Sequence, residues 1–249
     1  MAGRVSVGFV ESPRLTATTS LSSRPRKEHP FFMHTPLRYQ LTNYDCGPTT
    51  MLNAVSCLFD REDIPPEIVR NVMLYSLDCY SAEGAPGRAG TSRMAMQFLA
   101  SWLDGFGRAT KLPLSTRYLS GRTVTLSQES AITDALIRGG VAVVRLYYDV
   151  EHYVLLSGLT SSRDKALMFD PWYVPADDQE FAGTGIEIDT CHPFHYNRIV
   201  PLRCFACTHC TECPQKSPYA LGPTENREAV LLFNDRITKE AGEGIEYFI

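Results

Sequence analysis

The chain lacks the features that mark several broad functional classes. None of its apolar runs approaches the roughly 18 consecutive residues of a membrane-spanning helix. Basic residues are not in excess, because 24 Lys and Arg stand against 28 Asp and Glu and the formal net charge is −4. Since a chain-wide basic surface is absent, the sequence predicts no nucleic-acid partner as well as no membrane span.

A secretory signal is also missing. Residues 1–32 are rich in Ser and Thr and contain no apolar segment of the kind that a signal peptide needs. We predict that 1–32 is a disordered or spurious N-terminal extension. The remainder, 33–249, is long enough to bury the core of one domain. Because the sequence has no secretory signal and its cysteines show no evident disulfide pairing, the protein is expected in the reducing cytoplasm.

Cysteine is too sparse for a disulfide scaffold, with eight residues in a chain of 249. Hydrophobic residues make up 44% and charged residues 21%, as in ordinary globular proteins. Four of the cysteines are crowded between 204 and 213, whereas the others are spread along the chain. The cysteines are therefore not expected to share one role.

Helical patterns precede strand patterns along the chain. Apolar residues at helical spacing predict helices at 49–59, from 65 onward, after Gly90 and at 128–138. We expect the second and third helices to turn these residues inward: Ile68, Val69, Val72, Met73, Met94, Phe98, Leu99 and Trp102. Runs of β-branched and aromatic residues predict strands at 141–148, 152–159, 166–169 and 229–233. Helices followed by an antiparallel sheet indicate an α+β fold.

The segment from Gln40 to Thr49 carries the strongest chemical signal. Cys46 stands directly before a predicted helix, and the positive end of a helix dipole stabilises a thiolate there. Gly47 leaves room beside the sulfur for a substrate carbonyl. Gln40 lies six residues upstream, and its side-chain amide together with the Cys46 backbone N–H would form an oxyanion hole.

A thiol nucleophile needs a base and a group that orients the base. His152 opens an apolar strand, so its imidazole is expected at the sheet edge on a rigid support. Asp170 closes the next predicted strand. Because the start of one strand of a hairpin lies beside the end of the other, we expect His152 and Asp170 to be adjacent.

These residues together resemble a known family. Gln40, Asp45-Cys46-Gly47-Pro48, His152-Tyr153-Val154 and Asp170-Pro171 follow the order of the double-glycine leader (bacteriocin-processing) peptidases, family thirty-nine of the cysteine peptidases in the papain-like clan. The resemblance covers about 36–173. It implies a papain-like fold with N-terminal helices packed on a C-terminal antiparallel sheet.

The resemblance also implies roles for single residues. Cys46 would be the nucleophile, His152 the general base, Asp170 its orienting partner and Gln40 the oxyanion-hole donor. The motif includes Asp45, to which no chemical step is assigned. No cofactor is required for this chemistry.

The chain departs from the best-known members, which are N-terminal domains of peptide exporters and cut leaders after Gly-Gly. It has no membrane helices and no nucleotide-binding loop of the form G-x-x-x-x-G-K-[ST]. We therefore expect a stand-alone member that hydrolyses an amide bond of a peptide or protein. Two alternatives remain open: an amidase or acyl transferase with the same triad, or a non-catalytic module that binds a peptide or a metal.

The crowded cysteines form a run of C-x2-C steps, a spacing with which thiolates chelate soft metals. The candidate ligands are Cys204, Cys207, Cys210 and Cys213. Zinc is favoured over an iron–sulfur cluster because the bacterial cluster pattern has three residues before its last cysteine, where this chain has two. Cys191 with His192 or His195 would supply a second ligand pair. The alternative is a surface loop of reduced thiols without metal.

Overall fold

A seven-stranded antiparallel sheet forms the centre of the fold. The computed structural model describes residues 35–148, 150–206 and 218–238. The sheet has the strand order β1-β7-β2-β3-β4-β6-β5. Its strands are β1 (Leu114–Ser120), β2 (Val141–Tyr148), β3 (Val150–Leu159), β4 (Lys165–Phe169), β5 (Glu187–Ile188), β6 (Arg198–Pro201) and β7 (Glu228–Asn234). Within the described residues the helices are α1 (Cys46–Leu58), α2 (Pro66–Ser76), α3 (Arg93–Ala109), α4 (Ala131–Ile137) and α5 (Leu202–Phe205).

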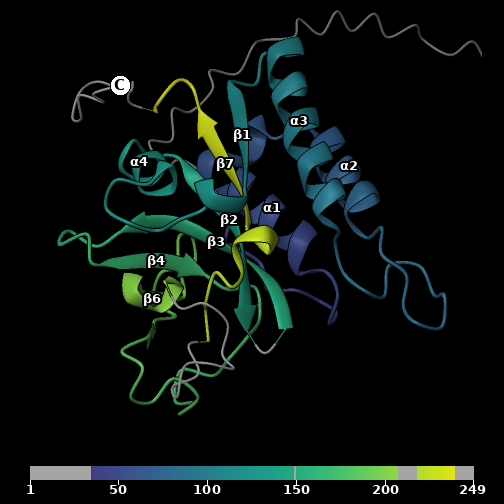
Figure 1. The fold of residues 1–249 in the computed structure, drawn as a ribbon. Coiled ribbons are helices and arrows are strands. Elements are labelled where there is room, and N and C mark those ends of the chain that lie inside the picture. Colours follow the sequence, from purple (N-terminus) through teal and green to yellow (C-terminus); the bar gives the residue numbers. More distant parts are fainter. Residues whose placement is uncertain (1–34, 149, 207–217, 239–249) are drawn as a thin grey trace, which may run out of the picture. The chain divides into compact units, whose positions relative to one another are not determined.

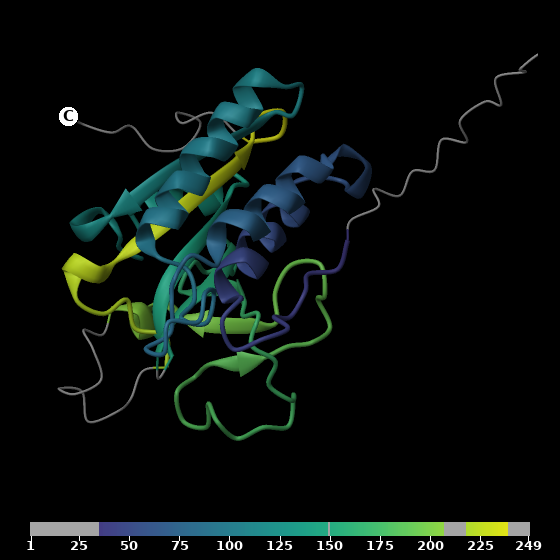
Figure 2. The same cartoon turned by 90° about the vertical axis from the view of Figure 1, so that its right-hand side faces the viewer.

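Helices cover both faces of the sheet, as Figure 1 and the turned view of Figure 2 show. Along β2, Val141 and Val143 face the core shared with α1, α2 and α3, whereas Ala142 and Val144 face the core shared with α4. All four are buried, which explains why β2 is a continuous apolar run instead of an alternating one. The predicted α+β class is confirmed.

The predicted elements are present, although several boundaries shift. The first helix begins at Cys46 instead of 49, and the last strand occupies the interior of the sheet between β1 and β2. The sequence analysis missed β1, β5, β6 and α5. Because β1 lies between α3 and α4 in the chain, helices do not simply precede the sheet. Within the described residues, no helix is long and apolar enough to cross a membrane.

The inward face predicted for α2 and α3 is partly wrong. Leu99 is fully buried, but Met94 and Phe98 are 77% and 46% exposed. The face of α3 that meets the sheet carries small residues such as Ala100 and Gly107, and a Cβ at Gly107 would lie 1.9 Å from the Leu114 carbonyl oxygen. The buried face of α3 combines bulky residues such as Met96, Leu99 and Leu103 with the small residues that meet β1, and Met94 and Phe98 lie outside this face.

The same discrepancy occurs in α2. Ile68 and Val72 are fully buried, as predicted, whereas Val69 and Met73 are 41% and 42% exposed. Only one narrow line of α2 meets α1 and α3, since the helix lies on the outside of the helical layer (Figure 1). The apolar stripe in the sequence is therefore wider than the face of α2 that is buried in the core.

Candidate active site

Cys46 is the first residue of α1 and is buried, with 8% of its surface exposed. The first backbone bond of the helix runs from Thr49 N to Asp45 O, at 3.0 Å. The N–H groups of Cys46 and Gly47 precede that bond, and Pro48 has none, so two backbone donors point out of the helix start. These donors and the positive end of the helix dipole can stabilise negative charge that develops on a group bound beside Cys46.

His152 and Asp170 are neighbours, as the sequence predicts. Antiparallel pairing of β3 with β4 opposes Leu155 to Phe169, so the start of β3 lies beside the residue that follows β4. The Nε2 atom of His152 is 2.7 Å from Oδ1 of Asp170. His152 is 5% exposed and Asp170 is fully buried. Water therefore does not compete for this contact.

The Cys46 side chain is also a hydrogen-bond partner of His152, and this contact contributes to the raised pKa of the imidazole. With Nε2 engaged by Asp170, Nδ1 is the nitrogen that remains for the sulfur. The Thr50 hydroxyl donates to the Tyr153 carbonyl at 3.0 Å and ties α1 to β3 one residue from His152. The structure thus brings three of the predicted residues into one row.

The surroundings of the row favour its charged form. Burial by itself lowers the pKa of His152, but the charge and hydrogen bond of Asp170, together with those of Cys46, outweigh burial and raise it above the ordinary value. Burial raises the pKa of Asp170, but His152, the Trp172 backbone N–H and the Tyr219 hydroxyl lower it by a larger amount. An ionised Asp170 beside a protonated His152 is the favoured state.

The loop before Cys46 is held against the same site. The backbone N–H of Gln40 donates to the Pro171 carbonyl at 2.9 Å, next to Asp170 in the chain. Gln40 Nε2 donates to the Thr42 carbonyl at 2.7 Å, and its Oε1 is buried without a hydrogen-bond partner. One N–H of the amide remains available, which is compatible with the predicted oxyanion-hole role.

Asp45, to which the sequence analysis assigned no chemical step, organises this loop. Its carboxylate accepts the backbone N–H groups of Leu41 at 3.0 Å and Thr42 at 2.7 Å and also the Thr42 hydroxyl at 2.6 Å. Asp45 is 6% exposed. Burial raises the pKa of Asp45, but these hydrogen bonds lower it below its usual value. The residue thus joins the start of α1 to the segment that presents Gln40.

Replacing Asp45 by Ala should release this loop. We expect a stability loss of about 2 kcal/mol, because several hydrogen bonds to a buried, charged acceptor are broken. Because Gln40 is then less well placed, kcat/KM for an amide substrate should fall about 10-fold to 100-fold, the range for one weakened oxyanion donor. Denaturant unfolding and steady-state kinetics measure the two effects. Asp45→Asn, which keeps one acceptor oxygen, should lie between; an Ala variant with unchanged kcat/KM would contradict the positioning role.

The space at Gly47 has a different use from the one predicted. A Cβ on Gly47 would lie 2.3 Å from the Thr91 hydroxyl oxygen and 2.8 Å from the Thr91 Cβ. Thr91 therefore fills the room beside Gly47 that the sequence analysis assigned to a substrate carbonyl. Glycine is needed there because the loop before α3 packs directly on the first turn of α1.

The sequence analysis missed the residues that support Asp170 from behind. Asn197 accepts from the Asp170 backbone N–H and donates to its carbonyl, both at 2.8 Å. The Trp172 backbone N–H and the Tyr219 hydroxyl each donate to the carboxylate at 2.8 Å. Asn197 and Tyr219 lie 27 and 49 residues beyond Asp170 in the chain. No local pattern signals them, because their link to Asp170 exists only in the folded sheet.

The predicted metal ligands are not assembled in the part of the chain that the structure describes. Cys204 is buried in α5, and the other three cysteines of the group fall outside the described residues. His192 Nδ1 lies 3.1 Å from Asp189 Oδ2 instead of pairing with Cys191. Within the described residues, no three His, Cys, Asp or Glu side chains are placed to hold a metal ion. The predicted N-terminal extension, 1–32, also lies outside the described residues.

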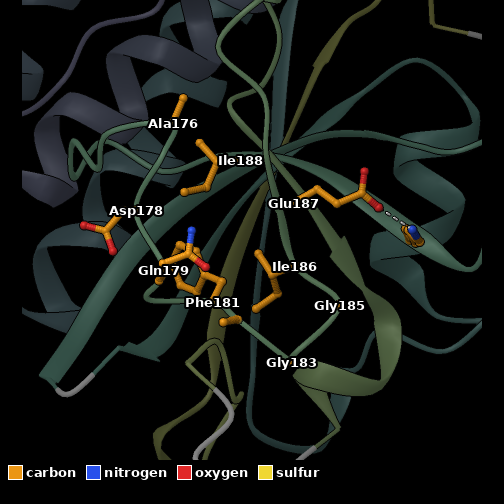
Figure 3. A pocket seen from close by; sticks show the side chains of 11 residues that line it. Ala176, Asp178, Gln179, Phe181, Gly183, Gly185, Ile186, Glu187 and Ile188 are labelled. Carbon is orange, nitrogen blue, oxygen red and sulfur yellow. Dashed lines mark hydrogen bonds and ion pairs between the residues drawn. The ribbon is translucent and has the colours of Figure 1, made fainter.

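A cavity of about 380 Å³ lies elsewhere, between β4, β5 and the loop that precedes β5. Its lining includes Phe181, Ile186 and the Lys165–Glu187 ion pair, whose atoms are 2.6 Å apart (Figure 3). None of the four predicted catalytic residues lines it. The cavity is therefore distinct from the Cys46 site.

No protein-family model matches this chain, and no curated protein matches it significantly. Function is therefore inferred from the geometry of the site and from the chemistry of its residues.

Proposed function

We propose that this chain is a cysteine hydrolase that cleaves an amide bond of a peptide or protein. The observation that carries the proposal is that His152, which is buried, has both Asp170 and the Cys46 side chain as hydrogen-bond partners. We further propose that the fold is papain-like and that the chain is related to the double-glycine leader peptidases as a stand-alone member. The order of Gln40, Cys46, His152 and Asp170 supports that relationship.

The proposed reaction has two halves. The Cys46 thiolate attacks the carbonyl carbon, and the C–N bond breaks as the His152 imidazolium gives its proton to the leaving amine. Neutral His152 then takes a proton from water, whose oxygen attacks the acyl-enzyme and releases the carboxylic acid. The sulfur leaves as thiolate, and His152 again carries the proton. Asp170 keeps the imidazole oriented and stabilises its positive charge in both halves.

Two groups at the helix start are proposed to stabilise the oxyanion. The Cys46 backbone N–H is free of the helix bond ladder, and Gln40 Nε2 has one donor beyond its bond to Thr42. Donors that are already in place cost no reorganisation when negative charge develops on the carbonyl oxygen. The 2.9 Å backbone bond from Gln40 to Pro171 supports this role, since it keeps Gln40 next to the triad.

No cofactor is part of the proposed chemistry, and zinc bound at the 204–213 cysteines remains a separate proposal. The proposed compartment is the cytoplasm, because a reducing environment preserves a thiol nucleophile. The free thiols Cys57, Cys79 and Cys191 are consistent with that environment.

Selective alkylation tests whether Cys46 is an activated thiol. Iodoacetamide at pH 6 should label Cys46 at least about tenfold faster than any other cysteine, because a thiolate and not a thiol reacts. Burial raises the pKa of Cys57 to about 11, and burial and Asp78 raise that of Cys79, so neither competes at this pH. Peptide mapping by mass spectrometry gives the rates.

His152→Ala is the diagnostic variant of this experiment. It should remove the fast reaction of Cys46 while leaving the slow labelling of Cys57 and Cys79 unchanged. Fast labelling confined to 204–213 would overturn the proposal. If Cys46 is activated, a peptide library separates the reactions: new amino termini indicate a peptidase, whereas ammonia release or acyl exchange indicates the amidase or transferase alternative.

A further inference from the structure

Tyr219 joins the candidate active site from a distant part of the chain. It is fully buried, and its hydroxyl donates to Asp170 Oδ2 at 2.8 Å. The other carboxylate oxygen, Oδ1, accepts from His152 and from the Trp172 backbone N–H. Each oxygen of Asp170 therefore has its own donors, and the Tyr219 hydroxyl is the side-chain group on Oδ2.

Rigid packing holds the Tyr219 ring. It stacks on Tyr148 with ring centroids 5.4 Å apart and packs against Phe181 at 5.7 Å. Tyr148 in turn faces the His152 ring at 6.3 Å. The backbone on the far side is also tied down, because Leu221 N–H donates to the Phe205 carbonyl at 3.1 Å. A phenol fixed in this way restricts rotation of the carboxylate that it binds.

We propose that Tyr219 is a positioning residue of the triad. Its hydroxyl fixes the Asp170 carboxylate, so that Oδ1 keeps its hydrogen bond with His152 and the carboxylate remains ionised. The inference rests on the proposed function, which includes Asp170 as the orienting group. Without this donor, Oδ2 would lose the hydrogen bond that the described residues give it, and protonation of Asp170 would relieve that loss. A protonated Asp170 no longer stabilises the His152 imidazolium.

Several charged and titratable groups face this carboxylate. His152 from β3 is the cation that contacts it, Tyr148 from β2 is a neutral phenol, and the Arg198 guanidinium from β6 acts on Tyr148 and Tyr219. Arg198 is fully buried, donates to the Asn197 carbonyl at 2.8 Å and lies over the Phe181 ring. The charge of His152 lowers the pKa of Asp170 and keeps it ionised at neutral pH, so loss of the Tyr219 hydroxyl should become visible on the acid side.

The test is the pH profile of Cys46 alkylation in Tyr219→Phe, a change that removes one oxygen atom. In the wild-type chain the rate should fall only at low pH, when the thiolate–imidazolium pair is lost. In the variant, Asp170 takes up its proton at higher pH, so the acid limb should move upward by about half a pH unit or more. At pH 5 this shift corresponds to a loss of about threefold or more in rate.

Tyr118→Phe is the matched control, because the Tyr118 hydroxyl also donates to a buried carboxylate, Glu228, at 2.8 Å. It loses the same kind of bond and should leave the acid limb of Cys46 in place. If Tyr219→Phe does not fold, 3-fluorotyrosine incorporated at position 219 replaces it. This more acidic phenol donates more strongly, and the acid limb should then move downward.

The outcomes separate the inference from the proposed function, since alkylation requires no peptide substrate. Fast Cys46 labelling with the same acid limb in wild type and in Tyr219→Phe would overturn the inference alone. An unmoved limb in the 3-fluorotyrosine protein would do the same. Slow Cys46 labelling in the wild-type chain would overturn the proposed function, and the positioning role with it. A shifted limb in Tyr219→Phe and an unshifted one in Tyr118→Phe support the inference.

Discussion

Replacing Cys46 by Ala is expected to lower kcat/KM for amide hydrolysis by about 10⁴-fold or more, the scale on which removal of a triad nucleophile acts. The effect is this large because no other group in the described site can form the acyl-enzyme. The remaining donors and the His152–Asp170 pair can still bind substrate, so affinity should change far less than turnover. Single-turnover kinetics together with direct binding of a cleavable peptide separate the two.

Cys57→Ala is the matched control, because it makes the same substitution about three turns further along α1, near the end of the helix. The Cys57 thiol packs against the core, and burial raises its pKa to about 11, so it stays neutral. This variant should keep its turnover within about twofold of the wild-type value, because the substitution removes no contact with the transition state. If both variants hydrolysed peptides equally well, Cys46 would not be the nucleophile.

The pH dependence of kcat/KM for amide hydrolysis is a second test of the proposed function. The leaving amine takes its proton from the His152 imidazolium, and the pKa of His152 is raised by Asp170 and Cys46 against the opposing effect of burial. Activity should therefore persist above pH 6.5, where a free imidazole loses its proton, and decline only as pH rises through the raised value. A decline centred at about pH 6.5 would show that the pair is not formed in solution.

Replacing Gly107 by Ala is expected to destabilise the fold by about 3 kcal/mol or more, the upper range for overpacking. The added Cβ would lie 1.9 Å from the carbonyl oxygen and 2.9 Å from the carbonyl carbon of Leu114, which are backbone atoms of β1. No side-chain rotation relieves such a contact, so α3 must move away from the sheet. The denaturant midpoint measured by circular dichroism should fall accordingly.

Gly105→Ala, in the same helix, is the control. Nothing lies within 4 Å of a Cβ at Gly105, so the substitution should stabilise the helix by about 0.5–1 kcal/mol. The two substitutions should therefore change the stability in opposite directions, although helix propensity alone predicts the same stabilisation for both. Equal midpoints for the two variants would mean that the close approach of α3 to β1 is absent in solution.

Much of the candidate site could be predicted because its signals are local in sequence. Cys46 precedes a helix, His152 begins a strand, and Asp170 ends the next one. The antiparallel hairpin of β3 and β4 is a short-range pairing, so the adjacency of His152 and Asp170 followed from strand order alone. Predicting this adjacency required only that the two segments be assigned correctly as strands.

The buried face of α3 could not be predicted in the same way. Hydrophobicity favours burying Met94 and Phe98, but the helix contacts β1 through Ala100 and Gly107. The buried face is rotated from the predicted one, because Met96, Leu99 and Leu103 enter the core while Met94 and Phe98 lie outside it. β1 was missed for a related reason, because its sequence, LSTRYLS, holds few apolar residues and its pairing partner β7 lies more than 100 residues away.

The sequence by itself determined which residues make up the proposed catalytic row and their order along the chain, because a cysteine at a helix start and a histidine at a strand start are local features. Tertiary structure alone decided what supports that row. Asn197 and Tyr219 meet Asp170 only after β6 has paired with β4 and the chain beyond α5 has folded back. A fully buried carboxylate needs donors on both oxygens, and the folded chain supplies them from residues that carry no local pattern.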